Sequence, residues 1–238
     1  MKDVEYYNKI IDDCEDMIIT VLENALTADE SLKYGVAATI AYEILDLKLS
    51  INALLENSCY AGIRSLTRTM LENYIYLVYI LQEDSVRRSE AYLLSIYKEM
   101  SIVAQKQREN KTIQEMIKED KSLNLTINFY EENHKDVEEY VKRYNEIYDH
   151  QLKKWYSDDN KTNSIYSLFK RLGKSYVYDT VYRYLCLETH GNNGFKHLTL
   201  VDEEYAKFQR TTVNIDEIEG ITSNILIEVK NELNKLTN

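Results

Sequence analysis

The sequence predicts an all-α protein, an antiparallel bundle of helices in a single domain over residues 1–238. Three observations lead to this prediction: the chain has no Pro, it has only 6 Gly among 238 residues, and its apolar residues recur at helical spacing. Strand-rich folds need frequent turns, and this chain has almost none of the residues that make them. Without Pro, long stretches are free to be helical, and a chain of this length can bury a substantial core.

The first predicted helix covers residues 4–26 and carries an apolar stripe in steps of three and four. The stripe consists of Val4, Tyr7, Ile11, Cys14, Ile18, Val21 and Ala25. Thr27 and Glu30 form a capping-box pattern that begins a second helix. We expect this helix to reach Leu55, either as one continuous helix or with a break near Leu49.

The third predicted helix, residues 61–82, is the most apolar element of the chain. Its second half, from Asn73 to Leu81, is apolar or aromatic on nearly every side, which is typical of a helix at the centre of a bundle. A fourth helix is predicted over residues 85–108. Its expected inward residues are Ala91, Leu94, Tyr97 and Val103.

Residues 107–163 differ from the rest of the chain because they are dense in Lys, Glu and Asp. We expect a charged helical insertion within the domain, made of one short and one longer amphipathic helix. Ion pairs at i,i+4 spacing indicate a solvated face, and a recognition arm is a second interpretation. The clearest loop in the insertion is residues 157–161.

Two shorter helices are predicted next, over residues 164–172 and 175–190. The second ends at His190, because two Gly and two Asn follow within the next four residues. Asn192 and Asn193 belong to this loop, which we expect to extend to about residue 213.

A final helix begins at Asn214, since Asn214 and Glu217 form another capping pattern. Its apolar stripe consists of Ile215, Ile218, Ile221, Ile225, Val229, Leu233 and Leu236. The pattern predicts a helix that packs one face against the bundle.

Composition limits the classes of partner. With 40 acidic and 29 basic residues the net charge is −11, so any contact with RNA must be confined to a local groove. The longest apolar run, Tyr74 to Leu81, is too short to span a bilayer, and the N-terminus lacks the apolar core of a signal peptide. We therefore expect a cytoplasmic protein without a membrane partner. Cys14, Cys59 and Cys186, odd in number and widely spaced, are expected to be buried thiols.

Arg183 and His190 form the first group that can carry chemistry. Seven residues of helix return to within about 20° of the starting direction, so the two side chains share one face, two turns apart. Asp179, four residues before Arg183, can orient its guanidinium. Arg binds phosphate oxygens and His moves protons near neutral pH, which suits phosphoryl chemistry. The other interpretation is structural: a His at the negative end of a helix dipole and a surface Arg paired with Asp179.

Arg64, Arg68 and Glu72 form a second group, spaced by four residues along the third helix. Charges on a central helix are costly to desolvate, so we expect Arg68 and Glu72 to be largely inaccessible and paired. A structural pair is one interpretation. The other is that these charges line the same pocket as Arg183 and His190.

No cofactor and no metal are predicted. Cys186 and His190 have the i,i+4 spacing that can chelate a metal, but the only further His close in sequence is His197, and its acidic neighbours are not arranged as ligands. His134 and His150 lie in charged segments and are expected at the surface.

Residues 183–190, Arg-Tyr-Leu-Cys-Leu-Glu-Thr-His, read as R-x6-H, which resembles the R-x4-6-H signature of HEPN (higher eukaryotes and prokaryotes nucleotide-binding) domains. In those domains the motif lies late in a helical bundle, with the His near a loop before the last helix, as here. Together with R-S-L-T-R-T-M-L-E, which contains Arg68 and Glu72, the segment Y-R-Y-L-C-L-E-T-H is also similar to an uncharacterised bacterial family associated with phage-defence neighbourhoods.

The resemblance implies a metal-independent endoribonuclease or toxin-like defence effector that acts as a homodimer. Two copies of Arg183 and His190 would meet across a two-fold groove. His190 would move the proton during attack of the RNA 2′-hydroxyl, and Arg183 would hold the scissile phosphate. One residue departs from the pattern: Tyr184 stands where catalytic HEPN motifs often have a polar residue.

The competing hypothesis is a non-catalytic helical module that binds a partner protein or a nucleotide, as an antitoxin or sensor subunit does. The negative net charge and Tyr184 favour it. The two hypotheses differ in whether the Arg183 and His190 side chains converge on an open cleft or pack against Tyr rings.

Overall fold

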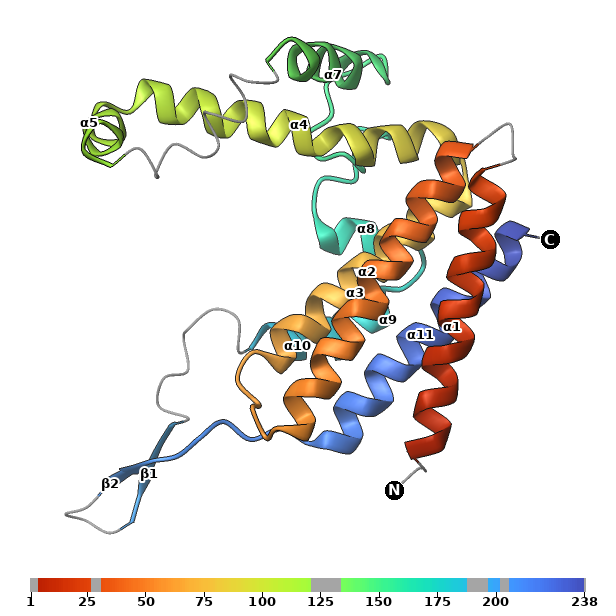
Figure 1. Cartoon of the computed structure of the whole chain (residues 1–238), viewed down its shortest axis with the longest axis vertical. Coiled ribbons are helices and arrows are strands. Elements are labelled where there is room, and N and C mark those ends of the chain that lie inside the picture. Colours follow the sequence, from red (N-terminus) through yellow and green to blue (C-terminus); the bar gives the residue numbers. More distant parts are fainter. Residues whose placement is uncertain (1–3, 27–30, 121–133, 188–196, 202–205, 238) are drawn as a thin grey trace. The chain divides into compact units, whose positions relative to one another are not determined.

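Figure 1 shows a computed structural model of the chain, which describes residues 4–26, 31–120, 134–187, 197–201 and 206–237. The all-α prediction is confirmed, since helices make up nearly all of the regular structure in these ranges. None of the helices described has the length and apolarity needed to cross a bilayer.

The contacts divide the chain into two compact units. The first consists of residues 1–83 and 165–238, and the second of residues 84–164. The second unit contains the charged segment 107–163 and also the helix that precedes it.

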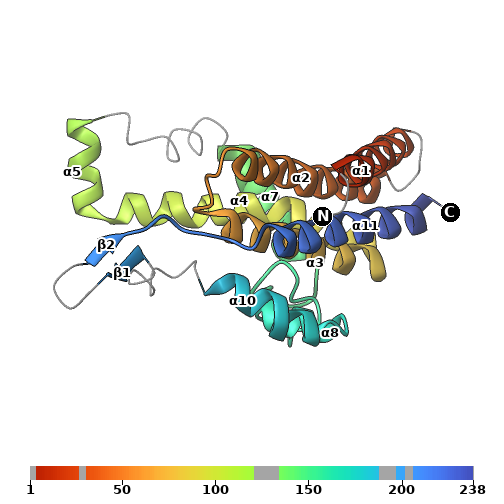
Figure 2. The ribbon, with the colours of Figure 1, turned by 90° about the horizontal axis from the view of Figure 1, so that it is seen from below.

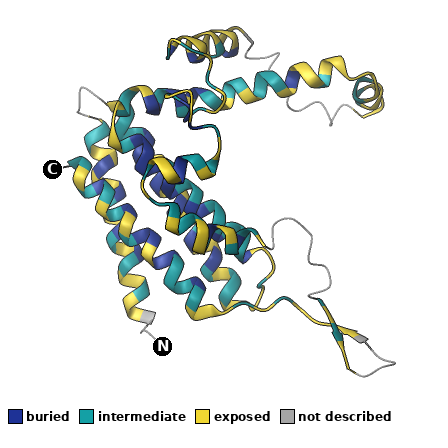
Figure 3. Cartoon of the chain, turned by 180° about the vertical axis from the view of Figure 1, so that it is seen from behind, coloured by how far each residue is buried: buried dark blue, intermediate teal, exposed yellow. Residues whose placement is uncertain are grey.

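Four long helices form the first unit: α1 (Val4–Ala25), α2 (Ser31–Glu56), α3 (Ile63–Gln82) and α11 (Ile215–Thr237). They lie side by side, and burial concentrates along the sides that face one another (Figure 3). α3 packs against both α2 and α11, and Ile75, Leu77, Tyr79 and Ile80 on it are fully buried. This confirms that the third helix is central.

The predicted stripes are correct over most of their length. On α1, Ile11, Cys14, Ile18 and Val21 are buried. On α11, the Asn214 side chain accepts the Glu217 amide as predicted, at 3.3 Å, while Ile215 at the helix start is exposed. α2 continues through Leu49 without a break. The predicted cap of Thr27 and Glu30 lies outside the described residues.

Residues 165–187 form a short helical layer on α3 (Figure 2), on the side away from α2. It contains α8 (Ile165–Arg171), α9 (Ser175–Val177), the π-helical turn η2 (Tyr178–Tyr182) and α10 (Arg183–Cys186). The prediction of one α-helix over 175–190 therefore needs correction: the helix includes a π turn, closed by the Arg183 amide donating to the Tyr178 carbonyl, and its described part ends at Cys186.

A small hairpin replaces part of the predicted loop before α11. β1 (Leu198–Leu200) pairs antiparallel with β2 (Ala206–Phe208), with Leu198 opposite Phe208. Three-residue strands are too short to show the alternation of polar and apolar residues by which strands are recognised, so the sequence pattern does not reveal them.

The second unit is built on α4 (Ser85–Glu109), followed by α5 (Lys111–Glu119) and α7 (His134–Glu146). α4 packs against α7 through small apolar clusters that include Ala91, Leu94, Ala104, Val137, Tyr144 and Ile147. The prediction that Val103 points inward is wrong, because Val103 is exposed and Ala104 is buried in its place.

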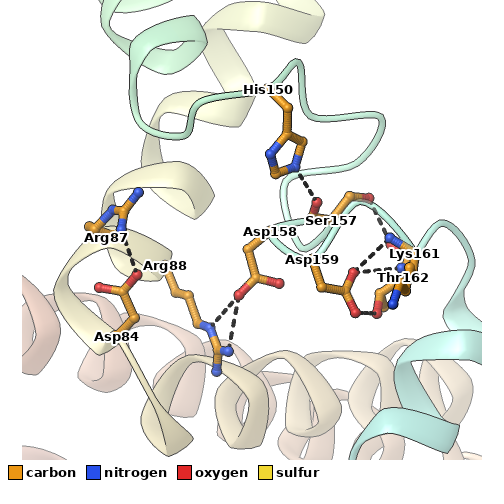
Figure 4. A network of polar contacts seen from close by, with 9 residues as sticks. All are labelled: Asp84, Arg87, Arg88, His150, Ser157, Asp158, Asp159, Lys161 and Thr162. Atoms are coloured by element: carbon orange, nitrogen blue, oxygen red, sulfur yellow. Dashed lines mark hydrogen bonds and ion pairs between the residues drawn. The ribbon is translucent and has the colours of Figure 1, made fainter.

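A hydrogen-bonded loop follows α7 and includes the predicted loop 157–161 (Figure 4). Nε and Nη2 of Arg88, on α4, donate to one Asp158 oxygen at 3.2 and 3.0 Å. Arg88 is only 3% exposed, so this unit contains a buried charged pair. The Ser157 hydroxyl donates to the Thr162 carbonyl, and Asp159 accepts from the Thr162 amide and hydroxyl.

Candidate functional site

The polar row on α3 faces the segment that holds the R-x6-H motif. Arg64, Arg68 and Glu72 are spaced by four residues, so they project from one side of α3, and that side packs against α10. Nη2 of Arg64 donates to the Tyr184 hydroxyl at 2.8 Å, and its guanidinium carbon lies 4.8 Å from the centre of the Tyr184 ring. A hydrogen bond and a cation–π contact thus join α3 to α10.

Tyr184 also reaches α11. Its hydroxyl donates to Oε2 of Glu217 at 3.1 Å while it accepts from Arg64. The pKa of Tyr184 is raised, mainly because burial disfavours the phenolate. Arg64 lowers this pKa, whereas Glu217 raises it. We call the chain Arg64–Tyr184–Glu217 the tyrosine bridge, because it ties three helices together through one phenol.

Arg68 and Glu72 make a second set of contacts with the same segment. Nε of Arg68 lies 3.3 Å from Oε1 of Glu72, which also accepts the Tyr182 hydroxyl at 2.7 Å. Nη1 of Arg68 lies 4.0 Å from Sγ of Cys186. The prediction of a pair is correct, but the two side chains are 25% and 23% exposed. Most of each side chain is nevertheless inaccessible, as predicted.

The contacts among Arg68, Glu72, Tyr182 and Cys186 shift the pKa values of Arg68 and Tyr182. Burial works against the charge of Arg68, but the contacts with Cys186 and Glu72 outweigh it, so the pKa of Arg68 lies above its usual value. Burial raises the pKa of Tyr182, and the hydrogen bond to Glu72 raises it further. Tyr182 therefore stays protonated and donates its hydroxyl to Glu72.

Arg183 points away from this network. Its side chain is 70% exposed, and Nη1 lies 3.8 Å from Oδ1 of Asp179, which is 56% exposed. The described contacts join Arg64, Arg68 and Glu72 to the tyrosines on either side of Arg183 and not to Arg183 itself. The predicted Asp179–Arg183 pair is present, as an exposed contact.

The other predicted site residues on this segment, His190, Asn192 and Asn193, lie outside the described residues. The motif is therefore described only from Arg183 to Leu187, five of its eight residues. The catalytic roles of Arg183 and His190 remain predictions.

Sequence reasoning missed a buried ion pair on the other side of α11. Lys48, on α2, is fully buried, and its Nζ donates to Oε2 of Glu219 at 2.6 Å. Burial lowers the pKa of Lys48, and Glu219 counteracts part of that shift. A signal was available in the sequence: Lys48 lies four residues after Ile44 and three before Ile51, within the buried stripe of α2.

Cysteine and histidine positions differ in part from expectation. Cys14 is buried, and burial raises the pKa of its thiol to about 12. The predicted burial is wrong for Cys59, which is exposed, and Cys186 is half-buried. His150, expected at the surface, is half-buried, and its Nε2 lies 3.0 Å from the Ser157 carbonyl oxygen. Among the described residues, no three His, Cys, Asp or Glu side chains are grouped so as to hold a metal ion.

The protein is thus an all-α protein in which Arg64, Arg68 and Glu72 on the central helix α3 hold the segment that contains Arg183. A model of the DUF5677 family, described as a family of unknown function, matches residues 34–209, and the chain belongs to that family. The match runs from α2 to the residue after β2 and includes both groups of predicted site residues. No match was found among curated proteins or among solved structures.

Proposed function

We propose that the chain is a HEPN-type, metal-independent endoribonuclease that acts as a homodimer, with Arg183 and His190 as its catalytic pair. The observation that carries the proposal is the position of Arg183. It is 70% exposed on a helix whose neighbouring residues, Tyr182 and Tyr184, are fixed to α3 and α11. A guanidinium presented from a rigid support can clamp a phosphate with little loss of ordering entropy.

The reaction is an internal transesterification followed by release. His190 takes the proton from the RNA 2′-hydroxyl, the 2′-oxygen bonds to phosphorus, and the bond from phosphorus to the 5′-oxygen breaks. The departing 5′-oxygen receives a proton, and the products carry a 2′,3′-cyclic phosphate and a 5′-hydroxyl. Arg183 stabilises the charge that develops on the phosphate oxygens, and Asp179 at 3.8 Å limits the directions of its guanidinium.

A homodimer explains how an acidic chain can hold RNA. Two-fold symmetry would place two copies of Arg183 and His190 along one groove, so that one His serves as base and the other as acid. The groove would be locally basic on a chain with a net charge of −11. In a cell, such an activity would suit a toxin-like effector of phage defence.

The test is cleavage of total RNA by the purified full chain in EDTA. Wild type should cleave, whereas Arg183→Ala and His190→Ala should lose almost all activity and keep the wild-type melting temperature. Lys170→Ala, which removes another exposed cation of the same layer, is the matched control and should cleave like wild type. Equal RNA degradation by wild type and His190→Ala would reject the proposal and indicate a contaminant.

The non-catalytic module remains the second candidate, and one observation favours it. Tyr184, which departs from the catalytic pattern, is fully engaged in the tyrosine bridge, so this position serves the packing of the helix. On this alternative, Arg183 would contact a partner protein or a nucleotide. RNA that stays intact with every variant, in any metal condition, would support it.

A further inference from the structure

A surface cavity of about 630 Å³ lies in the first unit, between the turn that joins α2 to α3 and the end of the hairpin. Its lining residues are Ser58, Cys59, Tyr60, Ala61, His197, Phe208, Gln209, Arg210 and Thr211. The volume is in the range of pockets that hold small organic ligands.

The lining has a charge opposite to that of the chain as a whole. The chain contains 40 Asp and Glu residues, yet none is among the described residues that line this cavity. Arg210 and His197 are there instead, together with Ser58, Tyr60 and Thr211, whose side chains carry hydroxyls. Such a lining favours an anionic group, and a phosphate is the anion that Arg and hydroxyl donors commonly bind.

An aromatic surface borders the same cavity. Phe208 is 86% exposed, although a ring of this size gains much free energy from burial, and Tyr60 on the opposite wall is half-buried. Exposed aromatic rings beside cations are the usual platform for an unstacked nucleic-acid base. The cavity thus offers both an apolar face and an anion site.

The hairpin holds these groups in place. The Gln209 amide donates to the His197 carbonyl at 2.8 Å, and Nδ1 of His197 lies 3.1 Å from the Gln209 carbonyl oxygen. A carbonyl oxygen only accepts, so Nδ1 carries the proton in this contact and Nε2 is the ring atom that can accept from a ligand or, once protonated, donate to it. The ring orientation is therefore set before a ligand arrives.

We propose that this cavity binds one unpaired nucleotide, with the base against Phe208 and the phosphate at Arg210 and His197. Part of its lining is close in sequence to the tyrosine bridge: Ala61 lies three residues before Arg64, which holds Tyr184 next to Arg183. As a subsite for an RNA substrate the proposal rests on the proposed ribonuclease function. As a site for a free nucleotide it does not.

The test measures binding to the full wild-type chain with two probes, AMP and a fluorescent octauridylate whose 2′-hydroxyls are all methylated. The methylated probe cannot be cleaved by the proposed mechanism, so binding is measured separately from activity. Phe208→Ala should weaken binding about tenfold, because stacking on one aromatic ring is worth about that much. Arg210→Ala should weaken it and also reduce its dependence on salt.

Leu200→Ala and Lys207→Ala are the matched controls. Leu200 is 76% exposed on the same hairpin and Lys207 is also exposed, but neither lines the cavity. Both should bind within about twofold of wild type. All four changes are at exposed positions, and circular dichroism should show unchanged helix content.

The outcomes distinguish the sources of the nucleotide. Competition between AMP and the oligonucleotide supports an RNA base in the cavity, and binding of AMP alone supports a free nucleotide. No saturable binding of either probe, or equal losses in the Leu200→Ala and Phe208→Ala variants, overturns the proposal. A chain that binds AMP but cleaves no RNA retains this site and loses the proposed function. If the chain cleaves RNA but the Phe208→Ala variant binds the probes as well as wild type does, the ribonuclease proposal stands and the nucleotide site is rejected.

Discussion

The two compact units of the chain are stabilised in different ways. The first is held by a continuous apolar core along α1, α2, α3 and α11, and its polar contacts are concentrated where α3 and α11 meet other elements. Among the residues that the structure describes, the second has small apolar clusters between α4 and α7, and its loop is fastened by the buried Arg88–Asp158 pair. Burial of apolar surface therefore dominates in one unit, whereas electrostatics and hydrogen bonds carry more of the stability in the other.

This contrast suggests where polar groups are structural and where they can be functional. In the second unit, charges replace the core that a charge-rich sequence cannot provide. In the first, an apolar core is already present, and we propose that the polar network on α3 serves to position the segment that contains Arg183.

The largest effect should come from removing the carboxylate that faces Arg88. Asp158→Ala leaves a guanidinium that is 3% exposed without its salt bridge, and the expected loss is about 3 to 5 kcal/mol of unfolding free energy in the second unit. Denaturant titration with a probe in that unit, such as Trp155 fluorescence, measures it. Glu90→Ala breaks the pair with Arg143, which is 54% exposed, and should cost less than about 1 kcal/mol. Similar losses in both variants would show that burial does not make the Arg88–Asp158 pair more stabilising than an exposed pair.

A somewhat smaller loss is expected when the buried pair of the first unit is broken. Glu219→Ala takes the counter-charge from the fully buried Lys48 ammonium and should cost about 2 to 4 kcal/mol, with partial relief as Lys48 loses its proton. The measurement is urea unfolding followed by circular dichroism. Glu232→Ala, on the same helix, faces a lysine that is 69% exposed and serves as the control. The double variant Lys48→Met/Glu219→Leu should regain most of the stability, since apolar packing can replace such a pair.

Glu72→Ala tests the half-buried part of the polar network. It removes the acceptor of both Arg68 and Tyr182. Arg68 is 25% exposed and can turn toward water, whereas the buried Tyr182 hydroxyl loses its acceptor, so we expect a loss of about 1 to 2 kcal/mol. Glu72→Gln keeps an acceptor for Tyr182 and should lose less. Equal thermal stability of wild type and Glu72→Ala would show that the network does not fasten the motif helix.

Alkaline pH should destabilise the second unit gradually, by a small amount for each of two buried tyrosines. Burial raises the pKa of both Tyr144 and Tyr148 to about 12, whereas an unfolded tyrosine ionises near pH 10. Their contribution is fully present below pH 10 and is lost as the pH rises toward 12, because the unfolded chain releases its protons first; at pH 11 the loss is about 1 kcal/mol per group. Unfolding curves at pH 8 and pH 11 measure it, and the variant Tyr144→Phe/Tyr148→Phe should show a flatter pH dependence.

The sequence predicts the helices well because their signal is local. Apolar steps of three and four locate α1, α3 and α11, and Asn214 shows where α11 begins. The hairpin and the π turn were not predicted, because neither has a periodic signature in so few residues. Val103 was predicted to be buried, but its neighbour Ala104 is buried instead. The apolar spacing therefore placed the buried face of α4 one residue away from its true position.

The site could be predicted only in part. Spacing identified Arg64, Arg68 and Glu72 as one row, but not their tyrosine partners, which come from residues more than a hundred positions away. The nucleotide-sized cavity depends on a turn and a hairpin that meet only in the fold. Such pairings between distant segments are decided by packing, which a single sequence does not reveal.

The π turn between Tyr178 and Tyr182 inserts one extra residue into the helix that leads to Arg183. Such a turn accommodates an extra residue and leaves the residues that follow in the directions they would have without it. A one-residue deletion there would convert the turn to ordinary α-helix, and Tyr182, Arg183 and Tyr184 would keep their orientations. The same deletion inside α3 would rotate every later side chain by about 100° and separate Glu72 from its partners. The motif helix can thus change length by one residue while its side chains keep their directions.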